Sequence, residues 1–350
     1  MEFSDLLILL AAAVIVLGFI CAGLAIWETR TSQGAIAWAI SLIAAPYIAL
    51  PLYMVFGRRK FRGYVTARRA AEIEAQQDPE ISEAVRTDTS LRTAREVGQM
   101  RVLETLADMP FTKGNDAKLL IDGRATFDAI FSAIDAAQDY VLVQFYIIRD
   151  DGLGTELSRR LMAATKRGVR THLIYDEIGS ASTKKKYFET MRDAGVLVSA
   201  FGSRRGRFNR FQLNFRNHRK IVVVDGQVAY VGGSNVGDEY LGLDPKIGDW
   251  RDTHVELRGP IVQAAQISFQ EDWYWATGNK LELNWKLQLS EDGDKAALIL
   301  ATGPADRYES CSLFFVLAIN AAVERIWIVS PYFVPDLDVI HALAVNSVDV

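Results

Sequence analysis

Two long uncharged stretches near the N-terminus constrain the fold of this chain more than any other feature. Residues 6–27 carry no charged side chain over 22 positions, and residues 34–56 carry none over 23. As α-helices, both are long enough to cross a hydrocarbon layer of about 30 Å. A secretory signal has a basic start, whereas this chain starts with Glu2 and Asp5. We therefore expect residues 1–60 to form a membrane anchor of two transmembrane helices.

The charges that flank these stretches predict their orientation. The segments "GRRKFRG" and "ARRA" follow the second stretch, while "ETRTSQ" between the two has one Glu and one Arg. Basic loops stay on the cytoplasmic side of a membrane. The sequence therefore predicts a two-pass anchor, with the rest of the chain in the cytoplasm.

Beyond the anchor, the pattern changes twice. Residues 61–115 begin with a stretch rich in Ala, Arg, Glu and Gln, which predicts an exposed helical connector. Over residues 116–290, short apolar runs such as "YVLVQFYII" and "KIVVVDG" alternate with helix-period stretches such as "GTELSRRLMAATKRG". This alternation is typical of an α/β lobe with a largely buried sheet.

An internal repeat suggests a second lobe. "AIDAAQDYVLVQFY" at residues 133–146 aligns with "AINAAVERIWIVSPY" at residues 318–332, and each reads as a helix end followed by a strand. The alternative is chance resemblance between two such units. A duplication makes residues 291–350 the beginning of a second, truncated lobe, whose counterpart of the first lobe's His218 would fall beyond residue 350.

Charge and composition exclude several functions. A net charge of −4 gives no general reason to expect a nucleic-acid partner. Cys21 and Cys311 are too few for a disulfide framework, and four scattered histidines do not suggest a metal cluster. We expect neither a metal nor another cofactor.

The stretch "RNHRKIVVVDGQVAYVGGSN", residues 216–235, carries the candidate chemistry. Asp225-Gly226 between two apolar runs predicts a two-residue hairpin turn, which would place Val224 opposite Gln227. His218 and Lys220 would then share one strand face, about 7 Å apart, because strand side chains alternate.

On the returning strand of this hairpin, residues 231, 233 and 235 would share that face, which brings Asn235 close to the pair. Gly232 and Gly233 would leave room for a ligand. The sequence therefore predicts a phosphate-sized site that contains a nucleophile.

The motif H-x-K-x-x-x-x-D, followed by G-G-x-N, resembles the hallmark of the phospholipase D superfamily. The chain is more narrowly similar to the bacterial cardiolipin synthases, in the two-helix N-terminus and in "FTKGNDAKLLIDG", "VQFYIIRDD", "NHRKIVVVDG", "GGSNVGDEY", "WRDTH" and "SPYFVPD". The resemblance implies an enzyme of phospholipid biosynthesis in the bacterial inner membrane that acts on anionic phospholipids such as phosphatidylglycerol.

The resemblance also implies roles for individual residues. His218 would attack a phosphodiester without a metal and form a phosphohistidine, while Lys220 and Asn235 would hold the phosphoryl oxygens. Asp225 would support the loop. Gly233 stands at a phosphate-contacting position where the superfamily often has Ser.

A neutral imidazole nucleophile needs an acceptor for its second nitrogen. Asp252, at the start of the next predicted strand, is the candidate, while an ordinary strand-start carboxylate is the alternative. We expect His254 to be structural and assign no role to His172 or His341.

One further motif bears on the partner. Residues 203–220 contain seven Lys or Arg with aromatic residues between them, a pattern that suits lipid phosphates at an anionic membrane. The same pattern could bind a nucleic-acid backbone or nothing at all. The membrane anchor favours lipid.

Three functions follow. The first is a phosphatidyltransferase that joins two phosphatidylglycerols into cardiolipin and releases glycerol. The second is an inactive remnant or interaction protein, and the third is a membrane-tethered phosphodiesterase completed by a homodimer. Because the superfamily uses a second histidine motif as general acid and base, which these residues lack, we expect little cardiolipin synthesis from the isolated chain unless a partner supplies it.

Overall fold

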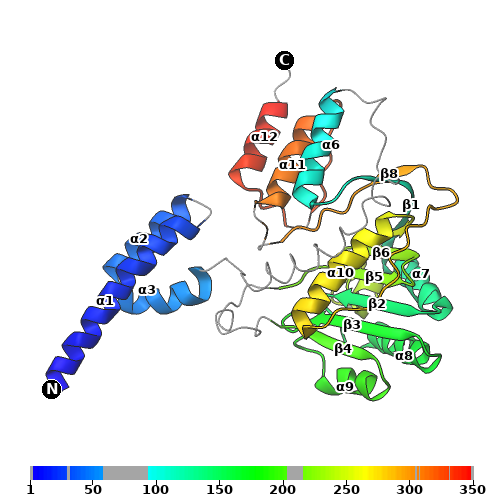
Figure 1. Cartoon of the computed structure of the whole chain (residues 1–350), viewed down its shortest axis with the longest axis horizontal. Coiled ribbons are helices and arrows are strands. Elements are labelled where there is room, and N and C mark those ends of the chain that lie inside the picture. Colours follow the sequence, from blue (N-terminus) through cyan, green and yellow to red (C-terminus); the bar gives the residue numbers. More distant parts are fainter. Residues whose placement is uncertain are drawn as a thin grey trace.

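The computed structural model describes residues 3–29, 32–57, 94–202, 216–303, 306, 308–330 and 332–347. Its N-terminal part is a helical hairpin, in which α1 (Phe3–Glu28) lies beside α2 (Ser32–Ala44) (Figure 1). The two helices approach closely at Gly18, where an added Cβ would lie 2.7 Å from the carbonyl oxygen of Leu42. A glycine is therefore needed for this contact.

Among the described helices, only α1 is long and apolar enough to cross a membrane. The second apolar stretch is instead divided into α2, α3 (Pro46–Leu52) and a short π-helix, η1 (Tyr53–Gly57). Ala45 leaves the helical conformation, with φ −139° and ψ 60°. Proline lacks an N–H and disfavours helical geometry in the residue before it, so Pro46 explains the break. The expectation of a second continuous spanning helix is not confirmed.

The described residues between 112 and 297 are built on one eight-stranded sheet with the order β4-β3-β2-β5-β6-β7-β1-β8. β2, β3 and β4 pair in parallel, and all other neighbours are antiparallel. The strands are β1 (Thr112–Ile121), β2 (Tyr140–Phe145), β3 (Arg170–Asp176), β4 (Leu197–Phe201), β5 (Ile221–Val224), β6 (Val228–Gly232), β7 (Thr253–Arg258) and β8 (Lys295–Ala297). The expected α/β lobe is confirmed.

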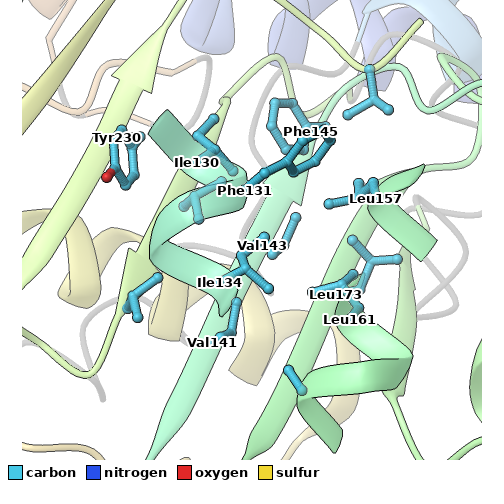
Figure 2. Packing of buried hydrophobic residues seen from close by; sticks show 14 of the residues in the cluster. Ile130, Phe131, Ile134, Val141, Val143, Phe145, Leu157, Leu161, Leu173 and Tyr230 are labelled. Carbon is cyan, nitrogen blue, oxygen red and sulfur yellow. The ribbon is translucent and has the colours of Figure 1, made fainter. Parts of the chain in front are cut away.

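Helices cover both faces of this sheet, because its central strands are apolar on both sides. Three helices, α7 (Asp122–Ala136), α8 (Gly152–Lys166) and α9 (Lys185–Asp193), contribute to one core cluster. Figure 2 shows Ile134 of α7 and Leu161 of α8 beside Val141 and Leu173 of the sheet.

The opposite face is covered by α10 (Ile261–Thr277), whose Phe269 packs with Leu142 and Val223 in a second core cluster. Consecutive residues of β2 thus face different layers, as strand geometry requires. The short 3-10 helix η2 (Asp238–Leu241) follows β6.

The predicted domain boundaries can be compared with the elements. The connector predicted for residues 61–115 is described only from residue 94, where α6 (Ala94–Ala107) precedes β1. β8, from the predicted second lobe, pairs with β1 of the first.

The remaining C-terminal elements are α11 (Ser310–Ala321), which lies beside α6, and α12 (Leu337–Ser347), which packs against α11 (Figure 1). The repeat predicts a strand after α11, but the structure assigns none to residues 322–330. Val323 and Val329 there are 92% and 98% exposed, because no neighbouring strand covers them in the part of the chain described.

Candidate active site

The predicted hairpin is present, but its register differs from the prediction. Val224 pairs with Val228, and Val222 pairs with Tyr230. The predicted pairing of Val224 with Gln227 is therefore wrong by one residue. A shift of one residue exchanges the faces of a strand, so residues 228 and 230, rather than 231, share a face with Val222.

Asp225 fastens the turn of this hairpin to the start of β2. Its carboxylate accepts the backbone N–H groups of Gln138, Asp139 and Tyr140 at 2.9, 2.8 and 2.8 Å. Its own φ of 53° lies in the left-handed region, which Asp tolerates better than most residues. Asp225 follows β5, whereas His218 precedes it, and these hydrogen bonds give the Asp225 carboxylate a structural role in the turn.

His218 lies outside the strand. Residues 216–220 are irregular, and β5 begins only at Ile221. The expectation that His218 and Lys220 share one face of a strand is therefore wrong. Lys220 instead turns back, so that its Nζ donates a hydrogen bond of 2.6 Å to the carbonyl oxygen of His218.

The neighbours of His218 hold its backbone through two buried carboxylates. The N–H of Asn217 donates to Asp176 at 2.8 Å, and its side-chain amide donates to Asp272 at 2.7 Å. Arg219 donates to the same oxygen of Asp272 at 2.9 Å. Asp272 is fully buried, and such charge-assisted hydrogen bonds are stronger than neutral ones. The nucleophile candidate is thus fixed from both sides along the chain.

The imidazole of His218 stacks on the ring of Tyr146, with centroids 3.8 Å apart and planes 19° apart. Burial lowers the pKa of His218 below its usual 6.5, and the charge of Lys220 lowers it further, while Asp176 opposes the shift. An imidazole with a lowered pKa is neutral near pH 7 and keeps a free lone pair. This is the state that a nucleophile requires.

Lys220 supplies the positive charge of the site. Burial lowers its pKa to about 8, and the charge of Asp252 partly opposes this shift. The ammonium lies 5.6 Å from the centroid of the Tyr146 ring, within the range of a cation–π contact. With a pKa of about 8, Lys220 is largely protonated at pH 7 and is suited to an anionic ligand.

Asn235 is 5% exposed and lies next to the residues that follow β2. Its Oδ1 accepts the N–H of Ile147, which follows Tyr146, at 3.0 Å, and its Nδ2 donates to the hydroxyl of Tyr240 at 2.7 Å. An amide nitrogen carries two protons, and among the described residues only Tyr240 accepts one from Asn235.

The two glycines of the motif make room for protein side chains. An added Cβ on Gly233 would lie 2.0 Å from Oδ1 of Asp252, and one on Gly232 would lie 2.4 Å from Nδ1 of His254. The N–H of Gly233 donates to the carbonyl of Thr253 at 3.2 Å. Protein side chains therefore fill the space beside Gly232 and Gly233 that was expected for a ligand, and contact of Gly233 with phosphate stays a prediction.

The carboxylate of Asp252 accepts the N–H of Thr253 at 2.7 Å and Nε1 of Trp250 at 3.2 Å. Within the described ranges, no hydrogen bond joins the Asp252 carboxylate to His218. The structure therefore does not have the predicted contact between Asp252 and the second nitrogen of His218. The charge of Asp252 acts on Lys220 and on His254 instead.

His254 is 1% exposed, and burial lowers its pKa to about 4, so it is neutral at pH 7. This agrees with the structural role predicted for it. His172 is likewise buried, with its pKa lowered to about 4, and its ring stands perpendicular to that of Trp273, with the ring centroids 5.0 Å apart. His341 lies in α12. Among the described residues, no group of His, Cys, Asp and Glu is arranged to hold a metal ion.

The topology explains why these residues meet. The end of β2 lies beside the start of β5, and the end of β6 lies beside the start of β7. Four side chains follow or precede these strands by a few residues and so gather at the same end of the central strands. They are Tyr146, His218, Asn235 and Asp252. Most of the basic stretch at residues 203–220 lies outside the described residues.

Sequence reasoning missed Tyr146, Asp176, Asn217 and Asp272. Asp176 ends an apolar strand, and Asp272 lies in a helix between aromatic residues, in "FQEDWYW". An acidic side chain in such apolar surroundings is a signal for a buried, hydrogen-bonded carboxylate. Asn217, which donates hydrogen bonds to both carboxylates, is however distant from them in sequence.

The site contains an imidazole beside an ammonium, from an H-x-K motif at the end of the central strands of an α/β sheet. This combination defines the phospholipase D-like class. Residues 130–273 match the family model for the phospholipase D-like domain of cardiolipin synthase. This range contains every candidate site residue above.

Curated relatives extend the likeness to nearly the whole chain. Cardiolipin synthase A of Pseudomonas fluorescens is 50% identical over 334 residues, which cover 93% of this chain and 69% of that protein. Cardiolipin synthase A of Pseudomonas aeruginosa is 48% identical over 345 residues, covering 96% and 69%. The chain therefore belongs to the cardiolipin synthase family of phosphatidyltransferases. Among solved structures, the phospholipase D family member Nuc of Salmonella typhimurium has a TM-score of 0.35 and 17% identity, covering 46% of this chain and 96% of that one.

Proposed function

We propose that this chain transfers a phosphatidyl group from phosphatidylglycerol, with His218 as the nucleophile. The observation that carries the proposal is the imidazole of His218, stacked on Tyr146, with the amine of Lys220 hydrogen-bonded to the carbonyl of the same histidine. The lone pair of the imidazole forms an N–P bond while the P–O bond to the glycerol headgroup breaks. The leaving oxygen takes a proton, and glycerol is released.

Each neighbouring residue has a part in this proposal. Lys220 and the side-chain amide of Asn235 contact the phosphoryl oxygens, whose negative charge grows as phosphorus is attacked. The negative charge of Asp252 raises the pKa of Lys220 and so favours its protonated form. Asp225 holds the turn of the hairpin. The hydroxyl of a second phosphatidylglycerol then attacks the phosphohistidine, which yields cardiolipin and restores His218.

The proton for the leaving oxygen requires a general acid. The resemblance gives this role to a second histidine motif, and the 350 residues contain one such motif. The proposal therefore includes completion of the site by a second histidine, from a homodimer partner or another segment. The first half-reaction, at His218, is the part that this chain supplies.

We further propose that residues 1–57 anchor the protein in the bacterial inner membrane as a two-pass hairpin. Most large apolar side chains of α1 are exposed, such as Ile8 at 68% and Phe19 at 56%, which suits contact with lipid. The basic segment after residue 57 favours the cytoplasmic side for the α/β lobe.

The test uses vesicles of phosphatidylglycerol labelled at phosphorus with ³²P. We expect a base-stable, acid-labile label on His218 of the wild-type chain and, with a completed site, cardiolipin as product. His218→Asn should lower labelling and turnover at least roughly 1000-fold, because the nucleophile is lost.

The matched control is His341→Asn, which changes a histidine in α12 and should label normally. Label of equal amount in His218→Asn would overturn the proposed nucleophile. Phosphatidic acid in place of cardiolipin would identify a hydrolase, the alternative function.

A further inference from the structure

Tyr146 is the side chain that contacts both proposed reacting groups without an assigned role. Its ring stacks on His218 at 3.8 Å and lies 5.6 Å from the Lys220 ammonium. It follows the last residue of β2, so the central sheet fixes its backbone. A ring that touches the nucleophile from a rigid element is able to set the orientation of that nucleophile.

The ring of Tyr146 packs directly against Gly179. An added Cβ on Gly179 would lie 2.7 and 2.8 Å from Cε2 and Cδ2 of Tyr146, and 2.3 Å from its carbonyl oxygen. Only glycine leaves space for the ring at this approach. The backbone of Gly179 is fixed in turn, since its N–H donates to Asp176 at 2.9 Å.

One buried carboxylate fixes both sides of the stack. Asp176 accepts the N–H of Gly179, which lies against Tyr146, and with its other oxygen the N–H of Asn217, which precedes His218. Asp176 is 2% exposed, so water competes little for these hydrogen bonds. Asp176 therefore connects the glycine that lies against the ring to the backbone beside the nucleophile.

Stacking also fits the chemistry. A contact on the face of an imidazole restricts its rotation but leaves both ring nitrogens, which lie at the edge, open to phosphorus. As the N–P bond forms, the imidazole gains positive charge, and the face of a phenol ring attracts a cation. The contact therefore becomes more favourable as the reaction proceeds.

We propose that Tyr146 is a positioning residue that holds the imidazole of His218 in the orientation required for attack; this inference rests on the proposed function. The planar ring, rather than the hydroxyl, carries the role. Tyr146→Phe keeps the ring, and Tyr146→Leu keeps apolar bulk without a planar face. The two variants therefore separate stacking from simple packing.

Two readouts are measured on the full chain. The first is the NMR spectrum of histidine-labelled protein, in which the ring current of Tyr146 shifts the His218 protons upfield; the His218→Asn spectrum assigns them. The second is the single-turnover rate of His218 labelling by ³²P-phosphatidylglycerol, measured over a range of lipid concentrations.

We expect wild type and Tyr146→Phe to share the shift and the maximal labelling rate. Tyr146→Leu should lose the shift and label about tenfold or more slowly at saturation, with a half-saturating lipid concentration within about twofold of wild type. Melting temperatures confirm that both variants fold. Equal saturating rates for Tyr146→Leu and wild type, or an effect confined to the half-saturating concentration, would overturn the inference.

Failure of the proposed function has a different signature. A wild-type chain that displays the ring-current shift but never acquires label at His218 would overturn the proposed nucleophile and, with it, this role. A chain that labels at His218 without the shift would overturn the role of Tyr146 alone.

Discussion

His218 depends on residues that never contact its imidazole. Asn217 and Arg219 on either side of it donate to Asp176 and Asp272, and the buried carboxylates accept several hydrogen bonds each. A buried carboxylate costs free energy unless its oxygens are fully hydrogen-bonded. Here the segment that carries the nucleophile supplies part of these hydrogen bonds, beside those from Gln144 and Gly179, so stability and function share contacts.

Asp225 permits a clean test of a structural carboxylate. Asparagine tolerates the left-handed conformation at φ 53°, but its amide nitrogen cannot accept the backbone N–H groups of residues 138–140. We expect Asp225→Asn to lower the free energy of unfolding by about 1–3 kcal/mol, measured by urea titration. His218 labelling of the folded protein should persist.

The control is Asp139→Asn, which removes an exposed carboxylate paired with Arg170 at 2.7 Å. Exposed ion pairs contribute about 0–1 kcal/mol, so this variant should unfold nearly as wild type does. Loss of labelling in Asp225→Asn at unchanged stability would instead assign the carboxylate to the chemistry.

At the scale of elements, Asn115 connects three segments. Its Nδ2 donates to the carbonyl oxygens of Thr112 in β1 and Lys295 in β8, at 2.8 and 3.1 Å, and its Oδ1 accepts the N–H of Ile261 at 2.8 Å. Ile261 begins α10, the helix that carries Asp272. The edge of the sheet is therefore joined to the helix that supports the nucleophile segment.

We expect Asn115→Ala to destabilise the protein by roughly 2–4 kcal/mol, because it leaves buried backbone groups without partners. Urea unfolding followed by tryptophan fluorescence measures this change. Asn279→Ala, at an exposed position after α10, is the matched control and should have little effect. Similar losses in both variants would contradict the bridging role of Asn115.

The elements also indicate what the sequence could predict. Apolar alternation predicted the α/β lobe, whereas the common site of His218, Lys220 and Asn235 was predicted from a strand register that the structure does not have. The register failed, because Asp225 is held by residues 138–140, almost ninety positions earlier in the chain, and local turn statistics do not include such a contact. Asp272 was missed for the same reason. By contrast, Pro46 was visible in the sequence, and its effect on the second apolar stretch was underestimated.

For the whole molecule, the proposed membrane orientation has a direct test. Cys311 is exposed, whereas Cys21 is buried in the helical hairpin, so Cys311 is a natural site for a maleimide that cannot cross membranes. We expect labelling of Cys311 in inside-out vesicles and none in intact spheroplasts. This result follows if the α/β lobe lies in the cytoplasm.

The matched variant is Ser32→Cys in a Cys311→Ser background, which places the thiol at the exposed start of α2. Its labelling should have the opposite sidedness, because the turn between α1 and α2 would face the periplasm. Labelling of both positions from one side would contradict the two-pass proposal.

The strand that leads away from His218 lies in the middle of the sheet, paired with β2 on one side and β6 on the other. Its residues Ile221–Val224 are buried on both faces. Local opening seldom reaches such a strand before the domain unfolds as a whole. The segment that carries the nucleophile is therefore continuous with a strand that should stay folded for as long as the domain does, so a local loss of structure is not expected to displace His218.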